Sequence, residues 1–188
     1  MTAKLKRGIT KVKDPGSALT HFIAMILAII AAIPLLSKAG HDSGHMRISA
    51  LAIFILSMIG LYAASTIYHT LDISPKINKL LRKIDHMMIF ILIAGTYTPV
   101  CMIVLGDKTG WTMLTLVWGI AIVGILINAL WITCPKWFSS LIYIAMGWVC
   151  ILAITKILSS MPRAGFMWLL AGGIIYTVGG IIYAMKLP

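Results

Sequence analysis

The chain has 188 residues, of which 60% are hydrophobic and 11% charged, whereas an ordinary soluble domain has about 45–50% apolar and about 25% charged residues. Sixteen Lys and Arg residues and only five acidic ones give a net charge of +11. This composition argues against a soluble enzyme, a disordered tail and a disulfide-rich secreted domain. The basic residues stand between long apolar runs, so they indicate membrane topology and contact with anionic lipid, and we expect no nucleic-acid partner.

Six apolar stretches are long enough to cross a bilayer, which takes about 20 mostly apolar residues in a helix. They lie at 18–36, 47–70, 86–105, 111–131, 139–158 and 166–186. We therefore expect an all-α, polytopic membrane helix bundle that forms a single transmembrane domain over residues 1–188, with residues 1–17 as a basic N-terminal segment. The first stretch is expected to be a span rather than a cleaved signal peptide, because five further spans follow it.

Lys and Arg are shared unequally between the alternating loops. With the N-terminus inside, most of them fall on the cytoplasmic side, so the positive-inside rule predicts a cytoplasmic N-terminus. Residues 77–84 place apolar side chains at i, i+3, i+4 and i+7, with Lys and Arg between them. This pattern predicts a short amphipathic helix at the cytoplasmic surface, which either binds anionic headgroups or serves only as a topology signal.

Small residues and one proline mark places where helices meet. In the last span they recur at helical spacing, at Gly173, Thr177, Gly180 and Ala184. Thr115 and Gly119 do the same on a smaller scale in the fourth span, and Pro99 interrupts the third. We interpret these features as packing devices. The three cysteines, Cys101, Cys134 and Cys150, are interpreted as buried small apolar groups, because they are odd in number and lack a CxxC pair.

Ionisable residues within a membrane are costly and call for an explanation. Ser65 and His69 stand at i and i+4 near the cytoplasmic end of the second span, and Asp85 begins the third span at the same depth. A hydroxyl, an imidazole and a carboxylate on neighbouring helices suit a zinc site, in which His69 ligates the metal while Asp85 and Ser65 orient a bound water. The alternative is a hydrogen-bonded pair that serves packing alone.

A zinc site normally takes three protein ligands, so His69 needs partners. His21 is one candidate, since Ser17 and His21 repeat the spacing of Ser65 and His69. The alternative for His21 is a helix cap by Ser17 or Thr20 with the imidazole at the membrane interface. His86 follows Asp85 directly and so points about 100° away from it around the helix, which favours an interfacial or supporting role.

Three motifs resemble the hemolysin III family. They are DPGSALTH at 14–21, ASTIYH at 64–69, and KIDH at 83–86 followed by AGTYTP at 94–99. The family comprises bacterial relatives of the progestin and adiponectin Q receptors, grouped with alkaline ceramidases among membrane hydrolases. The resemblance implies a seven-helix bundle in the bacterial inner (plasma) membrane, with zinc near the cytoplasmic face. It assigns His69 as a metal ligand, Ser65 as its neighbour and Asp85 as the group that holds the zinc-bound water.

The sequence departs from that pattern at its end. The family's other two ligands come from an H-x-x-x-H motif on the seventh helix, but the five histidines here stand at 21, 41, 45, 69 and 86. We expect either a chain cut short before that helix or a short natural form, in which a three-histidine site cannot assemble unless something replaces the helix.

Three possibilities remain open from the sequence, one of them a helical scaffold whose polar residues serve packing alone. The first is a zinc-dependent hydrolase of a lipid amide or ester, or a descendant of one, with a part in membrane lipid homeostasis. Its expected partners are the bilayer, anionic headgroups at the cytoplasmic face and a lipid substrate. The alternative is a non-enzymatic membrane sensor or a pore-forming, cytolytic protein, although the spans carry no ring of polar residues that would line a pore.

Overall fold

The computed structural model describes residues 12–41, 44–130 and 136–185, and within these ranges it contains helices and no strands. The helices are α1 (Pro15–His41), α2 (His45–Thr70), α3 (Pro75–Pro99), α4 (Lys108–Leu130), α5 (Lys136–Gly147), α6 (Ile154–Ser160) and α7 (Arg163–Ala184). A π-helix, η1 (Val100–Leu105), follows α3, and a 3₁₀-helix, η2 (Trp148–Ala153), joins α5 to α6. The basic residues 1–11, Cys134, and the ends of the predicted spans at 131 and 186 lie outside the described residues.

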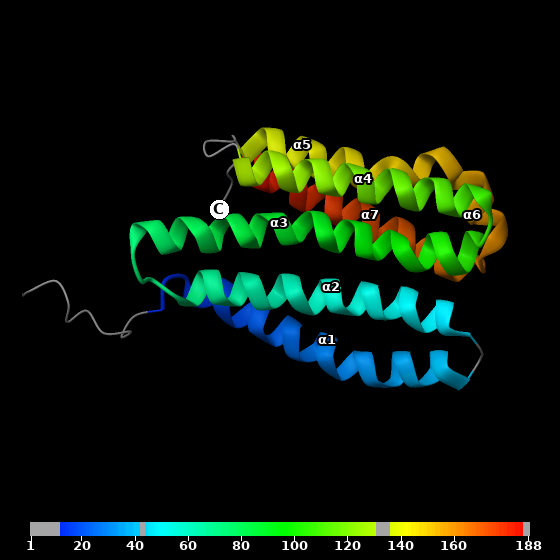
Figure 1. The fold of residues 1–188 in the computed structure, drawn as a ribbon, viewed down its shortest axis with the longest axis horizontal. Coiled ribbons are helices and arrows are strands. Elements are labelled where there is room, and N and C mark those ends of the chain that lie inside the picture. The colour runs from blue at the N-terminus through cyan, green and yellow to red at the C-terminus, as the bar shows by residue number, and fades with distance from the viewer. Residues whose placement is uncertain (1–11, 42–43, 131–135, 186–188) are drawn as a thin grey trace, which may run out of the picture.

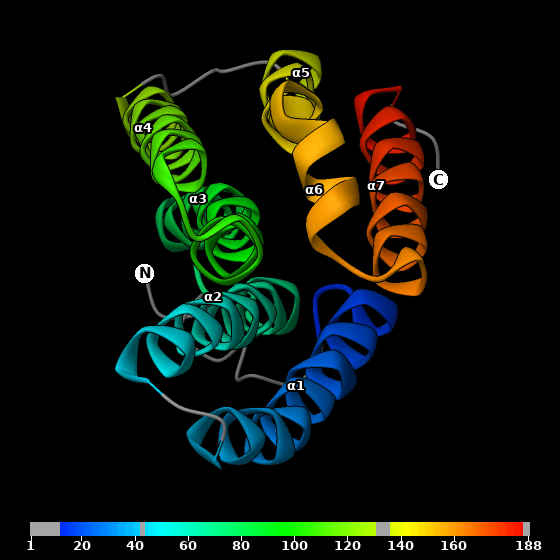
Figure 2. The same ribbon diagram turned by 90° about the vertical axis from the view of Figure 1, so that its right-hand side faces the viewer.

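Within the described residues, six helical segments are long and apolar enough to cross a membrane, as the sequence predicts. They are Pro15–Gly40, His45–Thr70, Pro75–Leu105, Lys108–Leu130, Trp137–Ser160 and Arg163–Ala184. Successive helices pack on one another from α1 to α4, and α5 packs against α7 (Figures 1 and 2). The buried core centres on α3, where Phe90 and Ala94 are fully buried, and it continues through Val117 of α4 and Ile157 of α6. In contrast, none of the residues of α7 is buried, as expected for a helix whose apolar side chains face lipid.

The third span begins eleven residues earlier than the sequence predicts, at Pro75 rather than 86. Ser74 caps this helix, because its hydroxyl accepts a hydrogen bond from the Ile77 N–H at 3.3 Å, and Pro75 follows at the first helical position. The amphipathic segment 77–84 is therefore helical as predicted, but it is the first part of α3 rather than a separate helix. No glycine or proline interrupts residues 76–94, so nothing in the sequence ends the helix at this point.

Pro99 ends the regular hydrogen-bonding of α3, and the π-helix η1 takes over at Val100. The predicted interruption of the third span is thus confirmed, and its cause is the missing N–H of proline. The hydroxyl of Thr98 donates to the carbonyl oxygen of Ala94 at 2.9 Å and accepts from the Trp118 ring N–H at 3.2 Å. The polar side chains around the proline are satisfied inside the bundle, as a break at membrane depth requires.

A second break, in the fifth span, was not predicted. The Tyr97 hydroxyl lies 2.6 Å from the Gly147 carbonyl oxygen and accepts a hydrogen bond from the Cys150 N–H at 2.9 Å. The hydroxyl thereby bonds to two backbone groups that would bond to each other's helix neighbours in an uninterrupted α-helix. α5 ends and the 3₁₀-helix η2 begins at this point. Of the cysteines described, Cys101 is buried and Cys150 half-buried, and both are free thiols.

The small residues of the last span are packing devices at two of the predicted positions. Thr177 accepts a hydrogen bond from the Trp148 ring N–H at 2.9 Å, and a Cβ at Gly180 would lie 2.9 Å from Ile144 Cγ1. At Gly173 and Gly119 the prediction is wrong, because no described atom outside the local helix comes within 4 Å of a Cβ placed there. In α4 the close approach occurs at Gly124 instead, where the Phe90 ring fills the space that a side chain would need.

At the end of the bundle where α3 passes into α4, one ion pair ties the connecting loop to α6. The Lys156 ammonium donates hydrogen bonds to the Asp107 carboxylate and to the Thr109 hydroxyl. The hydrogen bond from Lys156 and the Gly110 N–H lower the pKa of Asp107 below its ordinary value. This contact joins α6 to the loop between η1 and α4, at the end of the bundle opposite His21, His69 and His86.

Candidate functional site

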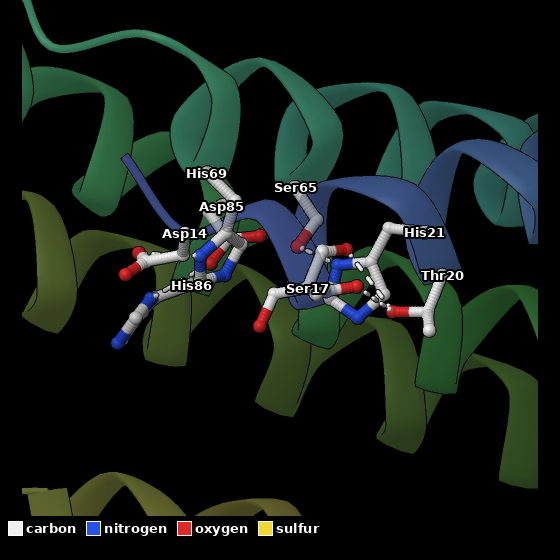
Figure 3. Close-up of polar contacts among 9 residues, drawn as sticks. Asp14, Ser17, Thr20, His21, Ser65, His69, Asp85 and His86 are labelled. Carbon is white, nitrogen blue, oxygen red and sulfur yellow. Dashed lines mark hydrogen bonds and ion pairs between the residues drawn. The ribbon is translucent and has the colours of Figure 1, made fainter. Parts of the chain in front are cut away.

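Three of the histidines gather at one end of the bundle, where α1 begins, α2 ends and α3 begins (Figure 1). We call this the histidine end; it carries His21, His69 and His86 (Figure 3). The segment before α1 is fastened to the last turn of α2, since the Asp14 N–H donates to the His69 carbonyl oxygen at 2.9 Å. The chain thus brings residues about fifty positions apart in sequence to one place.

His69 is held by a carboxylate. Its Nδ1 lies 3.0 Å from Asp14 Oδ2, and the two residues form an ion pair when the imidazole is protonated. Within the described ranges, His69 Nε2 has no hydrogen-bond partner. The sequence analysis missed this role of Asp14, because only the fold shows that the residue before α1 meets the end of α2. A carboxylate on one nitrogen that leaves the other nitrogen available is the usual arrangement of a metal-binding histidine.

Ser65 is buried and shares a face of α2 with His69, as its spacing predicts, yet its partner is His21 of α1. Ser65 Oγ and His21 Nδ1 are 2.5 Å apart. The interpretation of His21 as part of a helix cap is therefore wrong: α1 starts at Pro15, and the Thr20 hydroxyl donates within the helix to the Gly16 carbonyl oxygen at 3.0 Å. His21 instead crosses to α2, and the centroids of the His21 and His69 rings are 5.6 Å apart.

Asp85 is buried on α3, near the polar residues of α1 and α2. The close-up places Asp85 together with His21 and His69 at the histidine end (Figure 3). The carboxylate of Asp85 also lies 3.4 Å from Nδ1 of His86, its neighbour in sequence. Ser65, His69 and Asp85 thus lie at the same end of α2 and α3, as predicted, but each has a different polar partner. Ser65 contacts His21, His69 contacts Asp14, and Asp85 lies beside His86.

His86 connects this cluster to the last helix. Its Nε2 lies 2.7 Å from the hydroxyl of Tyr183 on α7, and its carbonyl oxygen accepts a hydrogen bond from the Tyr143 hydroxyl of α5 at 2.9 Å. The expected supporting position of His86 agrees with these contacts. Tyr183 was missed from sequence, because a tyrosine near the end of an apolar span usually marks only the membrane interface.

The described residues do not complete a zinc site. Within 12–41, 44–130 and 136–185, no group of three or more His, Cys, Asp or Glu side chains could hold a metal ion. His69 has the environment of one ligand, but Nε2 of His86 lies against the Tyr183 hydroxyl and Ser65 takes one nitrogen of His21. We therefore assign no catalytic step to a metal.

These features define the class of protein: a multi-pass helical membrane protein with a buried polar cluster at one end. Comparison with known proteins gives the family. The family model described as "Haemolysin-III related" matches residues 9–188, so the chain belongs to the hemolysin III family. It is 40% identical to Hemolysin-3 of Bacillus cereus over 190 aligned residues, which cover 100% of the chain and 86% of the relative. It is also 37% identical to the Hemolysin-3 homolog of Bacillus subtilis (strain 168) over 174 residues, covering 93% of the chain and 81% of that protein.

Proposed function

We propose that the chain is a hydrolase of a lipid amide or ester, or a descendant of such an enzyme, with a part in membrane lipid homeostasis. The observation that carries this proposal is the cluster of Ser65, His69 and Asp85, in which Ser65 and Asp85 are buried and His69 is half-buried, since ionisable residues at membrane depth are costly unless they serve a function. The proposed setting is a bacterial inner membrane, with the N-terminus and the histidine end at the cytoplasmic face. The excess of Lys and Arg in the corresponding loops supports this orientation.

Each residue of the cluster has a role that fits its contacts. Asp85 acts as the general base, because it is a buried carboxylate near the other polar groups and can accept a proton from water. Ser65 orients the water or the developing oxyanion through its hydroxyl, whose direction His21 fixes at 2.5 Å. Asp14 holds the His69 ring, so that Nε2 has a defined direction.

A zinc ion belongs to this proposal as an expectation from the family. When bound, zinc polarises a carbonyl and activates water. His69 would hold it through Nε2. The further ligands are not found among the described residues, so the roles of Asp85 and Ser65 above are stated from their own contacts alone.

An apolar cavity of about 380 Å³ supports a lipid as the substrate. It runs along α3 from Ile89 and reaches Val100 of η1, and it is lined on the other side by residues of α5, η2, α6 and α7, among them Trp168 and Gly173. Ile89 lies four residues after Asp85, about one helical turn along α3. An acyl chain in this cavity would therefore have its polar end close to the buried carboxylate.

The basic beginning of α3 supports binding of anionic headgroups at the same face. Lys76, Lys79 and Arg82 are exposed. Lys83 is not available, since its ammonium donates to the Ala129 carbonyl oxygen at the end of α4 at 2.7 Å. The three exposed cations are the residues that we propose contact lipid phosphates.

The metal assignment is tested by the zinc content of the purified protein. We expect any zinc that the parent chain binds to be lost in His69→Ala and kept in His45→Ala, whose imidazole lies at the opposite end of α2. Equal zinc in all three proteins would refute His69 as a ligand.

A cytolytic function is the second candidate, and the names of the two relatives, Hemolysin-3 and Hemolysin-3 homolog, are the observation that favours it. Conductance across liposomes that contain the purified protein distinguishes the two functions. We expect no currents above those of empty liposomes, and stable single-channel steps would favour the cytolytic function.

A further inference from the structure

The imidazole of His86 is contacted on both ring nitrogens. Its Nε2 lies 2.7 Å from the Tyr183 hydroxyl of α7. Its Nδ1 is shielded from solvent and forms no standard hydrogen bond among the described residues, but Asp85 Oδ2 stands 3.4 Å away. The three side chains form a row, from the phenol of α7 through the imidazole to the carboxylate of α3.

The chemistry of the two ends sets the tautomer of the ring. A neutral imidazole carries a proton on one nitrogen and a lone pair on the other. If the proton were on Nε2, the lone pair of Nδ1 would face the Asp85 carboxylate, and the two would repel each other. With the proton on Nδ1, the N–H faces the carboxylate and Nε2 accepts the hydrogen bond from the Tyr183 hydroxyl. Only the second arrangement is favourable at both ends.

We propose that His86 is a positioning residue for Asp85: the carboxylate favours the Nδ1–H tautomer, and Tyr183 holds the ring through Nε2. The distance of 3.4 Å is longer than a standard N–H to oxygen hydrogen bond, so the ring acts on the carboxylate mainly through the charge and dipole of its N–H. The inference rests on the proposed function only for the role of Asp85 as the base. The tautomer itself follows from the contacts.

The neighbouring helices keep the ring in place. The Tyr143 hydroxyl of α5 donates to the His86 carbonyl oxygen at 2.9 Å, which anchors the backbone at this residue. α5 and η2 are in turn joined to α7, where the Trp148 ring N–H donates to the Thr177 hydroxyl at 2.9 Å. α7 therefore contacts the His86 ring directly through Tyr183 and supports it indirectly through η2 and α5.

Nitrogen NMR of ¹⁵N-histidine-labelled protein in nanodiscs tests the tautomer directly, with the His86 signals assigned by their absence in His86→Asn. We expect a protonated Nδ1 and an unprotonated Nε2 in the parent at neutral pH. In Tyr183→Phe the signal of the unprotonated Nε2 should shift, because it loses the hydrogen bond from the phenol, whereas Tyr176→Phe should leave the spectrum unchanged. Tyr176 is the matched control, because it lies two turns earlier on α7 and its hydroxyl has no hydrogen-bond partner among the described residues. An Nε2–H tautomer in the parent, or no response to Tyr183→Phe, would overturn the proposal.

Two substitutions separate positioning from packing in the lipid hydrolysis assay. His86→Asn places an amide N–H where Nδ1 stands, and His86→Gln places one where Nε2 stands. We expect His86→Asn to keep most of kcat and His86→Gln to lose about 10–100-fold in kcat with little change in KM. Equal losses in the two variants would contradict a role through Nδ1. A parent without hydrolysis would refute the proposed function, and the NMR result would still decide the placement of His86.

Discussion

α3 packs closely against α2 at Gly95. Substituting Gly95 by alanine gives a quantitative test of this packing. A Cβ at this position would overlap Ser57 Oγ and lie 2.8 Å from Ser57 Cβ. Carbon atoms pack best at about 3.5–4.0 Å, so the two helices would have to separate by about 1 Å. Because Ser65 and Asp85 are carried by these two helices, the separation would also widen the candidate site.

The expected cost follows from two opposing effects. Overpacking a filled core costs about 1–3 kcal/mol, while replacing glycine by alanine within a helix gains about 1 kcal/mol. Gly119→Ala is the matched control, since a Cβ there meets no described atom within 4 Å outside its own helix. Both variants share the gain in helix propensity, so the difference between them isolates the overpacking cost of about 1–3 kcal/mol.

The assay is reversible unfolding of the purified protein in mixed micelles of increasing SDS fraction, followed by tryptophan fluorescence. Gly95→Ala should unfold at a lower SDS fraction than Gly119→Ala. Adding Ser57→Gly should restore most of the loss, because the next atom, the Ile53 carbonyl oxygen, lies at an ordinary 3.6 Å. Equal stability of the two alanine variants would refute the close packing of α2 and α3 described above.

Three further outcomes are expected. Tyr97→Phe should lower the unfolding free energy by about 1–3 kcal/mol in the same assay, because the backbone groups that bond to the Tyr97 hydroxyl would be left unsatisfied in the interior. Unchanged stability would contradict the role of this hydroxyl in the break of the fifth span. The pKa of Asp107 is lowered from 3.8 in the folded protein, so the stabilisation from its pair with Lys156 is complete above about pH 3.8 and is lost as the pH falls through the lowered pKa. Asp107→Asn should remove this part of the pH dependence of the unfolding free energy. An identical loss of stability at acid pH in the parent and in Asp107→Asn would contradict it. Gly173 lines the cavity, so Gly173→Leu should abolish saturable quenching of tryptophan fluorescence by a brominated fatty acid. Gly179→Leu should not, because Gly179 lies in open space on the same helix but away from the cavity. Equal effects of the two substitutions would argue against an acyl chain in the cavity.

Much of the fold could be predicted from the sequence, because a membrane span leaves a signal in every residue that it contains. Long apolar runs located all six spans, and Pro99 marked the break in the third. The breaks that the sequence did not reveal depend on contacts between helices. Tyr97, for example, acts on backbone groups of the Gly147–Cys150 segment, about fifty residues away. No local pattern within the fifth span reports that contact.

The candidate site divides in the same way. Helical spacing placed Ser65 and His69 on one face and Asp85 at their level, because spacing along a helix determines which residues share a face. It could not give the immediate partners, since these come from other parts of the chain: Asp14 is 55 residues from His69, and Tyr183 is 97 residues from His86. Pairing across such distances is set by how the helices pack.

The proposed hydrolysis of a lipid by the polar cluster at the histidine end, with Asp85 as the base, is tested by the release of free fatty acid from a panel of lipid amides and esters. The assay uses the purified protein in nanodiscs, with Asp85→Asn as the comparison. We expect release by the parent and a loss of about 10²–10⁴-fold in Asp85→Asn, with the unfolding midpoint in SDS retained. Equal release by both folded proteins, or no release by the parent from any lipid of the panel, would contradict it.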